Sequence, residues 1–142
     1  MIRIFTDTSV FFSACYSEEG ASFEIFRQAL RGKVQLVISD YVLVETERSL
    51  AKKSPRDLQD FEIFRDNISF EIVNASKEEV LDAARYTALK DAPIVAAAKK
   101  AGVDYLVSLD RRHLVNQTEV ARASGLKIVL PEEIVREVRH GR

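Results

Sequence analysis

Four acidic residues, far apart along the chain, are the groups best suited to chemistry: Asp7, Glu45, Asp91 and Asp110. Asp7 directly follows one apolar run, and Asp110 comes shortly after another. In a parallel sheet both would face the edge at which the strands end, which is where ligands bind in open α/β sheets. Two carboxylates about 4 Å apart repel by roughly 4 kcal/mol at an effective dielectric constant of 20. We therefore expect such a group to bind a divalent cation, which relieves the repulsion.

Each of these acids also has a purely structural interpretation. Asp91 stands at the start of an alanine-rich segment, where Asp is a favoured helix N-cap, and Asp7 and Asp110 are of a type that starts turns. Glu45 has a competitor, because Glu47 falls on the same side of a helical wheel as four apolar residues, Leu43, Val44, Leu50 and Ala51. Periodicity alone thus favours Glu47 as the inward acid, and either glutamate could face solvent.

Apolar runs alternate with amphipathic segments along the chain. We expect strands at 2–6, 34–38, 70–73, 103–108 and 127–130, and helices at 22–30 and 91–101 and from residues 54, 76 and 131 onward. The segment after Ser39 is ambiguous, since 41–44 suits a strand and 46–53 a helix. Parallel neighbours need helical crossovers, so the alternation predicts a three-layer α/β/α sandwich with a mostly parallel central sheet.

Composition limits the possible classes of protein. With 142 residues, 46% of them hydrophobic, we expect a single domain over 1–142. The formal net charge of −1 provides no global positive field for nucleic acid. Cys15 is the only cysteine, which fits a reducing compartment. With no apolar run near 18 residues and no signal-peptide pattern, we expect a cytoplasmic protein without a membrane segment.

The local strings around the four acids resemble the PIN-domain family of nucleases, and most closely the toxin components of bacterial and archaeal VapBC-like toxin–antitoxin pairs. The strings are Ile-Phe-Thr-Asp-Thr-Ser-Val at 4–10, Val-Ile-Ser-Asp-Tyr-Val-Leu-Val-Glu at 37–45, Asp-Ala-Pro-Ile-Val-Ala-Ala-Ala at 91–98, and Gly-Val-Asp-Tyr-Leu-Val-Ser-Leu-Asp-Arg-Arg-His-Leu at 102–114. They stand in the family's order and spacing, and Ile-Val-Leu-Pro-Glu-Glu-Ile at 128–134 follows them. The resemblance covers nearly the whole chain.

The resemblance implies an active site made of the acidic quartet Asp7, Glu45, Asp91 and Asp110, and it favours Glu45 over Glu47 by its distance from Leu50. It places Ser9 and Ser108 in supporting positions, where related chains often carry Asn and Thr. Oxygen ligands suit Mg²⁺ or Mn²⁺, so we expect metal-dependent hydrolysis of RNA phosphodiester bonds by an endoribonuclease. The implied partners are an RNA substrate, an antitoxin protein and a second copy of the chain.

The basic residues and the histidine give weaker indications. Arg111 and Arg112 directly follow Asp110, so we expect them near the pocket as candidate contacts for RNA phosphate. The remaining basic residues of interest suit a solvated face, namely Lys52, Lys53, Arg56, Lys99 and Lys100. His113 could be a general base, but its place before Leu114 favours a structural role.

Two alternatives stay open at this point. The chain could be a PIN nuclease of RNA processing, or a PIN module that binds RNA without cutting it. It could also be a Mg²⁺-dependent phosphotransfer domain, because phosphatases of the haloacid-dehalogenase type and signalling receivers also place Asp at strand ends. A phosphatase of that type wants Asp-x-Asp, whereas Asp7 is followed by Thr8 and Ser9, and no lysine follows a late strand as a receiver would want.

Overall fold

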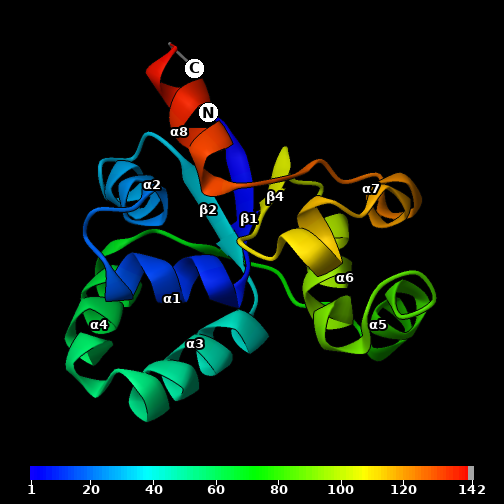
Figure 1. Ribbon diagram of the computed structural model, residues 1–142, viewed down its shortest axis with the longest axis horizontal. Helices are drawn as coiled ribbons and strands as arrows, with labels where there is room; N and C mark the ends of the chain where they lie inside the picture. The colour runs from blue at the N-terminus through cyan, green and yellow to red at the C-terminus, as the bar shows by residue number, and fades with distance from the viewer. Residues whose placement is uncertain (141–142) are drawn as a thin grey trace.

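A computed structural model describes residues 1–140 and shows a central parallel sheet between two layers of helices (Figure 1). The sheet order is β3-β2-β1-β4-β5, and each neighbouring pair is parallel. The strands are β1 (Arg3–Thr6), β2 (Gln35–Ile38), β3 (Glu71–Ile72), β4 (Tyr105–Val107) and β5 (Ile128–Val129). The three-layer fold class predicted from the alternating pattern is confirmed.

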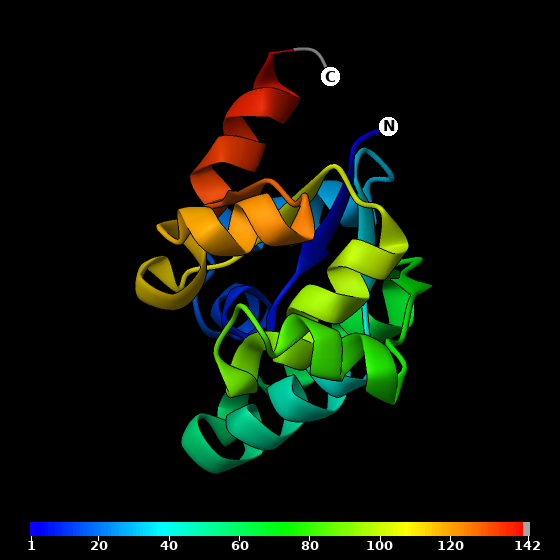
Figure 2. The same cartoon turned by 90° about the vertical axis from the view of Figure 1, so that its right-hand side faces the viewer.

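Helices cover both faces of this sheet. On one face lie α1 (Thr8–Tyr16), α2 (Ala21–Leu30) and α4 (Leu58–Asn67), and on the other lie α5 (Lys77–Ala83), α6 (Ala92–Ala101) and α7 (Thr118–Ser124). The second group stands in front of the sheet when the molecule is turned by 90° (Figure 2). The other helices are α3 (Asp40–Lys53) and α8 (Pro131–Arg139), with short helical turns η1 (Pro55–Asp57), η2 (Leu89–Asp91) and η3 (Arg111–Val115). None of the helices within residues 1–140 combines the length and apolar character that crossing a bilayer requires.

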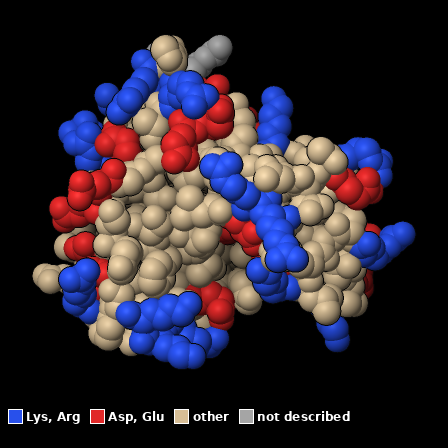
Figure 3. Space-filling view, viewed as in Figure 1, with Lys and Arg blue, Asp and Glu red and all other residues tan. Residues whose placement is uncertain are grey.

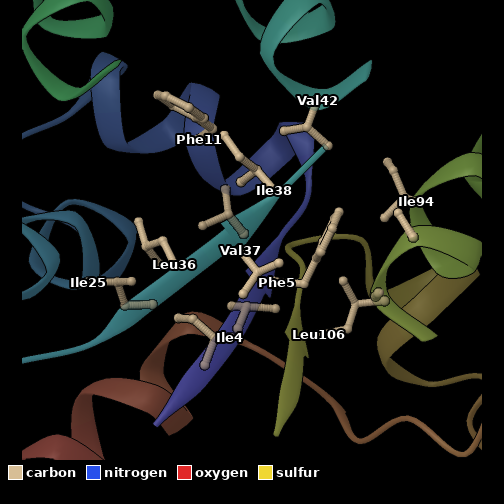
Figure 4. Packing of buried hydrophobic residues seen from close by; sticks show 14 of the residues in the cluster. Ile4, Phe5, Phe11, Ile25, Leu36, Val37, Ile38, Val42, Ile94 and Leu106 are labelled. Atoms are coloured by element: carbon tan, nitrogen blue, oxygen red, sulfur yellow. The ribbon is translucent and has the colours of Figure 1, made fainter. Parts of the chain in front are cut away.

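The hydrophobic core fills the space on both sides of the sheet. Leu36 of β2 points toward Ile25 of α2, whereas Phe5 of β1 points toward Ile94 of α6 (Figure 4). These strands carry apolar side chains on both faces, as expected of a parallel sheet covered by helices. Phe5, Phe11 and Phe26 are fully buried in this core, while Phe12 and Phe23 are partly buried and pack against it.

The sequence pattern does not predict two of the α-helices. The pattern predicts no helix before residue 22, yet α1 begins directly after Asp7. Thr, Ser, Val and Phe have modest helix propensity, and this segment is held as a helix by burial of Val10, Phe11, Ala14 and Cys15. The pattern gives no helix bounds for the segment between β4 and β5, which contains η3 and α7.

The ambiguous segment after Ser39 is a helix. The Ser39 side chain accepts a hydrogen bond from the Val42 amide, 3.2 Å away, and so caps the first turn of α3. The buried residues of α3 are Val42, Thr46 and Leu50, spaced four apart. Because these three residues face the core, they determine which glutamate of α3 is exposed, and that residue is Glu47.

Candidate active site

Asp7 is held by hydrogen bonds at the carboxyl end of β1. Its Oδ1 accepts from the Ser9 hydroxyl at 2.6 Å and from the Val10 amide at 3.1 Å, and its Oδ2 accepts from the Ser108 hydroxyl at 2.5 Å. Burial raises the pKa of Asp7, and the nearby charge of Asp91 acts in the same direction, against these hydrogen bonds. The carboxylate is thus firmly oriented in surroundings that disfavour its charge.

Two serines join the loops that follow β1 and β4. The Ser108 hydroxyl donates to Asp7 and accepts from the Asp110 amide at 2.9 Å, and the Ser9 hydroxyl accepts from the Leu109 amide at 3.1 Å. Both serines therefore fix the relative position of two acids that are far apart in the sequence.

Asp91 directly precedes α6 and is buried, with 7% of its surface exposed. It ends η2 and precedes α6, but its side chain makes no capping hydrogen bond. Its Oδ2 is buried and has no hydrogen-bond partner among residues 1–140. Burial raises the pKa of Asp91 and the charge of Asp110 adds to this rise, while Lys90 and His113 oppose it. The helix-cap interpretation therefore does not account for Asp91.

Asp110 precedes the turn η3 and contacts the side chains of Lys90 and His113. Its Oδ1 accepts from the His113 amide at 3.0 Å, its Oδ2 lies 3.2 Å from His113 Nδ1, and the Lys90 ammonium is 3.5 Å from the same oxygen. Burial pushes the pKa of Asp110 upward, but the hydrogen bonds and charge of His113, with the charge of Lys90, outweigh it and leave the pKa below its usual range. Asp110 is thus the acid of this edge that is kept ionised most easily.

The structure brings Asp91, Asp110 and His113 into one group, in which one ligand atom from each residue lies within 4.8 Å of the others. This is a distance at which a single cation could contact all three. Asp7 is linked to the group through Ser108, but it lies outside these three residues. His113, to which sequence patterns assigned a structural role, is the member that they missed. Its position one helical turn after Asp110 is the signal that could have found it.

Glu45 lies on the α3 side of this edge and is not part of the three-residue group. Its Oε1 is 2.6 Å from Arg48 Nη1, and its side chain is half-buried. Burial raises the pKa of Tyr41, and the charges of Glu45 and then Asp91 raise it further, so both acids lie within electrostatic range of this tyrosine.

The periodicity argument for Glu47 is wrong, because Glu47 is exposed whereas Glu45 is half-buried. The reason is Thr46, which a wheel of apolar residues does not count but which faces the core between Val42 and Leu50. That placement turns the buried stripe away from Glu47.

Arg111 and Arg112 are exposed at the start of η3. Neither guanidinium forms an ion pair with an acidic residue of the described chain. In the view of Figure 3, acidic side chains are recessed near the centre of the molecule, and a band of Lys and Arg side chains lies beside them. Negatively charged side chains in a recess are thus bordered by positively charged ones.

The sequence profile of the PIN domain family matches residues 3–112. The chain belongs to the PIN domain family. This membership agrees with the resemblance found in the local strings, and it leaves the phosphotransfer alternative without support. A comparison with curated proteins finds no match.

Several solved structures share this PIN fold. PAE2754 from Pyrobaculum aerophilum is 17% identical with a TM-score of 0.66, covering 98% of this chain and 90% of its own. VapC20 from Mycobacterium tuberculosis, described as a sarcin–ricin-loop-cleaving toxin, is 19% identical with a TM-score of 0.57, covering 77% and 91%. VapBC2 from Rickettsia felis, bound to a DNA fragment from its promoter, is 14% identical with a TM-score of 0.64, covering 91% and 98%. At these identities the likeness concerns the fold.

Proposed function

We propose that this PIN-domain chain is a divalent-metal-dependent endoribonuclease, with Asp7, Glu45, Asp91 and Asp110 as its active-site acids. The observation that carries the proposal is the convergence of Asp91 and Asp110 beside Asp7 at the carboxyl edge of the sheet. PIN domains are generally nucleases, and this acidic edge is where such chemistry needs its charge.

The donor set fits a hard divalent cation such as Mg²⁺ or Mn²⁺. Carboxylate oxygens are the ligands these ions prefer, and the Oδ2 of Asp91, which is buried without a hydrogen-bond partner in residues 1–140, could coordinate an ion. Asp91 and Asp110 would hold the ion, and Asp7, whose oxygens already accept hydrogen bonds from Ser9 and Ser108, would contact it directly or through water. A bound ion offsets negative charge on the phosphate and makes nearby water more acidic.

The remaining residues position substrate and water. Glu45, which is half-buried on α3, would orient the attacking water or help to hold a second ion. Arg111 and Arg112 would contact RNA phosphates, since they are exposed beside Asp110 and free of acidic partners within residues 1–140. Arg48 pairs with Glu45 while being largely exposed, so this ion pair can open without a large free-energy cost.

Asp→Asn substitutions at the site test this proposal through their effect on RNA cleavage. Asp7→Asn or Asp91→Asn should reduce Mn²⁺-dependent cleavage of RNA by more than roughly 1,000-fold, because each change removes a negative charge at the site. Asp104→Asn is the matched control: Asp104 accepts a hydrogen bond from the Arg3 amide at the opposite edge of the sheet, and this variant should cut like the parent. If Asp7→Asn and Asp91→Asn both cut like the parent, the assignment is wrong.

We further propose that the protein is the toxin of a toxin–antitoxin pair that works in the cytoplasm. Support comes from the shared fold with VapC20, described as a toxin, and with VapBC2. Expression of the chain alone should arrest growth, and co-expression of a small DNA-binding protein encoded beside it should restore growth. Arrest that this neighbour does not relieve would instead favour a PIN nuclease of RNA processing.

A second copy of the chain is also proposed as a partner. Light scattering coupled to size-exclusion chromatography measures the mass directly, and a value near twice the 16.1 kDa of the monomer is expected. A monomeric mass would contradict the proposed homodimer and would leave the proposal of the nuclease site unchanged.

A further inference from the structure

We propose that the imidazole of His113 is a direct protein ligand of the divalent cation, together with Asp91 and Asp110, and that it biases the site toward Mn²⁺ over Mg²⁺. This inference rests on the proposed function, since it concerns the same metal site. It adds a nitrogen ligand to an acidic quartet in which every other ligand is an oxygen.

The first argument is the position of the imidazole. Asp91, Asp110 and His113 each offer a ligand atom within 4.8 Å of the other two. Adjacent ligands of an octahedral ion with bonds near 2.1 Å lie about 3 Å apart, and opposite ligands about 4.2 Å apart. The observed 3.2 Å between His113 Nδ1 and Asp110 Oδ2 is therefore close to the spacing of two adjacent ligands.

The second argument is independent of the histidine. Asp91 is 7% exposed, and its Oδ2 is buried without a hydrogen-bond partner in the described chain. A buried carboxylate oxygen without a donor is costly, and a cation shared with Asp110 and His113 would satisfy it. The cluster thus contains an oxygen in need of a positive partner, next to an imidazole that can complete the ligand set.

The backbone of η3 holds His113 in this place. The Asp110 side chain accepts a hydrogen bond from the His113 amide at 3.0 Å, and Leu114, the next residue, is fully buried in the core. His113 is therefore anchored on both sides, while its ring remains partly exposed. An imidazole fixed in this way loses little conformational entropy when it binds an ion.

The chemical consequence is a change in metal preference. Both ions prefer carboxylate oxygen, but Mn²⁺ is the softer ion and accepts an imidazole nitrogen more readily than Mg²⁺, which retains water oxygens instead. To coordinate through Nδ1, the ring carries its proton on Nε2, and the Nδ1 contact with Asp110 changes from a hydrogen bond to a neighbouring-ligand contact. Loss of the nitrogen should then weaken Mn²⁺ binding more than Mg²⁺ binding.

The experiment uses Mn²⁺ as the probe on tag-free protein. The chain has two histidines, His113 and His140, so a ¹⁴N imidazole coupling seen by pulsed electron paramagnetic resonance has only two possible sources. Mn²⁺ titration gives the affinity for Mn²⁺, and competition with Mg²⁺ gives the second affinity. His140 is exposed at the end of α8, which makes His140→Gln the matched control.

In the parent we expect bound Mn²⁺ with a coupled imidazole nitrogen. His113→Gln should lose that coupling and bind Mn²⁺ about 10-fold more weakly or worse, with Mg²⁺ affinity changed by less than about 3-fold. Gln retains an amide that can donate to Asp110, so a role limited to positioning Asp110 would leave Mn²⁺ affinity unchanged in this variant. His113→Ala should match His113→Gln, and His140→Gln should match the parent.

Bound Mn²⁺ without imidazole coupling in the parent would overturn the ligand role of His113 and leave the proposed metal site standing. Equal losses of Mn²⁺ and Mg²⁺ affinity in His113→Gln would also overturn it. Absence of any Mn²⁺ binding to the folded parent would overturn both this inference and the metal-dependent function on which it rests.

Discussion

The two edges of the sheet contain the same kinds of charged residue but use them differently. At the amino edge, the Arg3 amide donates to Asp104 at 2.8 Å and the Arg3 guanidinium contacts Glu71 at 2.7 Å, so each acid has a direct partner. At the carboxyl edge, Asp91 has a buried Oδ2 with no partner among residues 1–140. A buried carboxylate oxygen without a hydrogen-bond donor is costly for the fold and is free to bind a ligand.

The two edges of this fold therefore serve different purposes, stability at the amino edge and chemistry at the carboxyl edge. Burial raises the pKa of Asp7 and of Asp91, so the carboxyl edge stores unfavourable free energy at neutral pH that a cation could relieve. The amino edge is a half-exposed network that salt screens. Four predictions test this contrast, beginning with the largest expected effect.

Removal of one supporting hydroxyl should impair cleavage. Ser108→Ala removes the donor to Asp7 and the acceptor of the Asp110 amide, and we expect RNA cleavage to fall about 10- to 100-fold. Ser124→Ala is a matched control, because Ser124 is also buried and its hydroxyl also makes two hydrogen bonds, donating to the Val120 carbonyl and accepting from the Leu126 amide. Both variants should lose about 1–3 kcal/mol of stability, and equal cleavage rates in the two would contradict the supporting role.

Neutralising Asp91 should stabilise the metal-free protein. Asp91→Asn relieves both the buried charge and its repulsion with Asp110, and we expect the Tm in metal-free buffer to rise by roughly 3 °C. Adding Mn²⁺ should raise the Tm of the parent but not that of the variant. Differential scanning calorimetry with and without Mn²⁺ measures both effects, and a lower Tm for the metal-free variant would show that Asp91 is not under electrostatic strain.

The same variant should reveal a pH dependence. Because burial raises the folded-state pKa of Asp91 above its ordinary value of 3.8, this group favours folding below pH 3.8, and its contribution is lost as the pH rises through the raised pKa. Asp91→Asn binds no proton at this position, so its stability advantage should be small near pH 3.8 and grow as the pH rises. Urea unfolding in metal-free buffer across this range measures the gap, and a gap independent of pH would contradict the raised pKa.

The smallest effect is expected at the amino edge. Glu71→Gln removes the charge that meets Arg3 in a pair whose side chains are 32% and 43% exposed, so the cost should be about 0.2–1 kcal/mol. Cleavage should be unchanged. Urea unfolding measures the loss, and a cost well above this range would mean that the amino edge stabilises the fold more than a screened surface pair can.

Much of the fold could be predicted from local patterns. Short apolar runs predict the five strands, and the helix expected from residue 76 is α5, which Ser76 and Glu79 cap with both hydrogen bonds of a capping box. Such signals are readable because they depend on neighbours within one turn or one strand. The helix α1 was missed because its residues have modest helix propensity and depend on burial against distant elements.

For the site, local sequence was enough to place Asp7 and Asp110 after strands, because an acid that follows a buried apolar run marks the end of that strand. The folded structure was needed to show that Glu45 is half-buried and Glu47 exposed, and that His113 lies with Asp91 and Asp110. These outcomes depend on the sheet order that sets β1 between β2 and β4. That order joins Ser108 to Asp7 across 101 positions of sequence, a distance at which local propensity and periodicity carry no information.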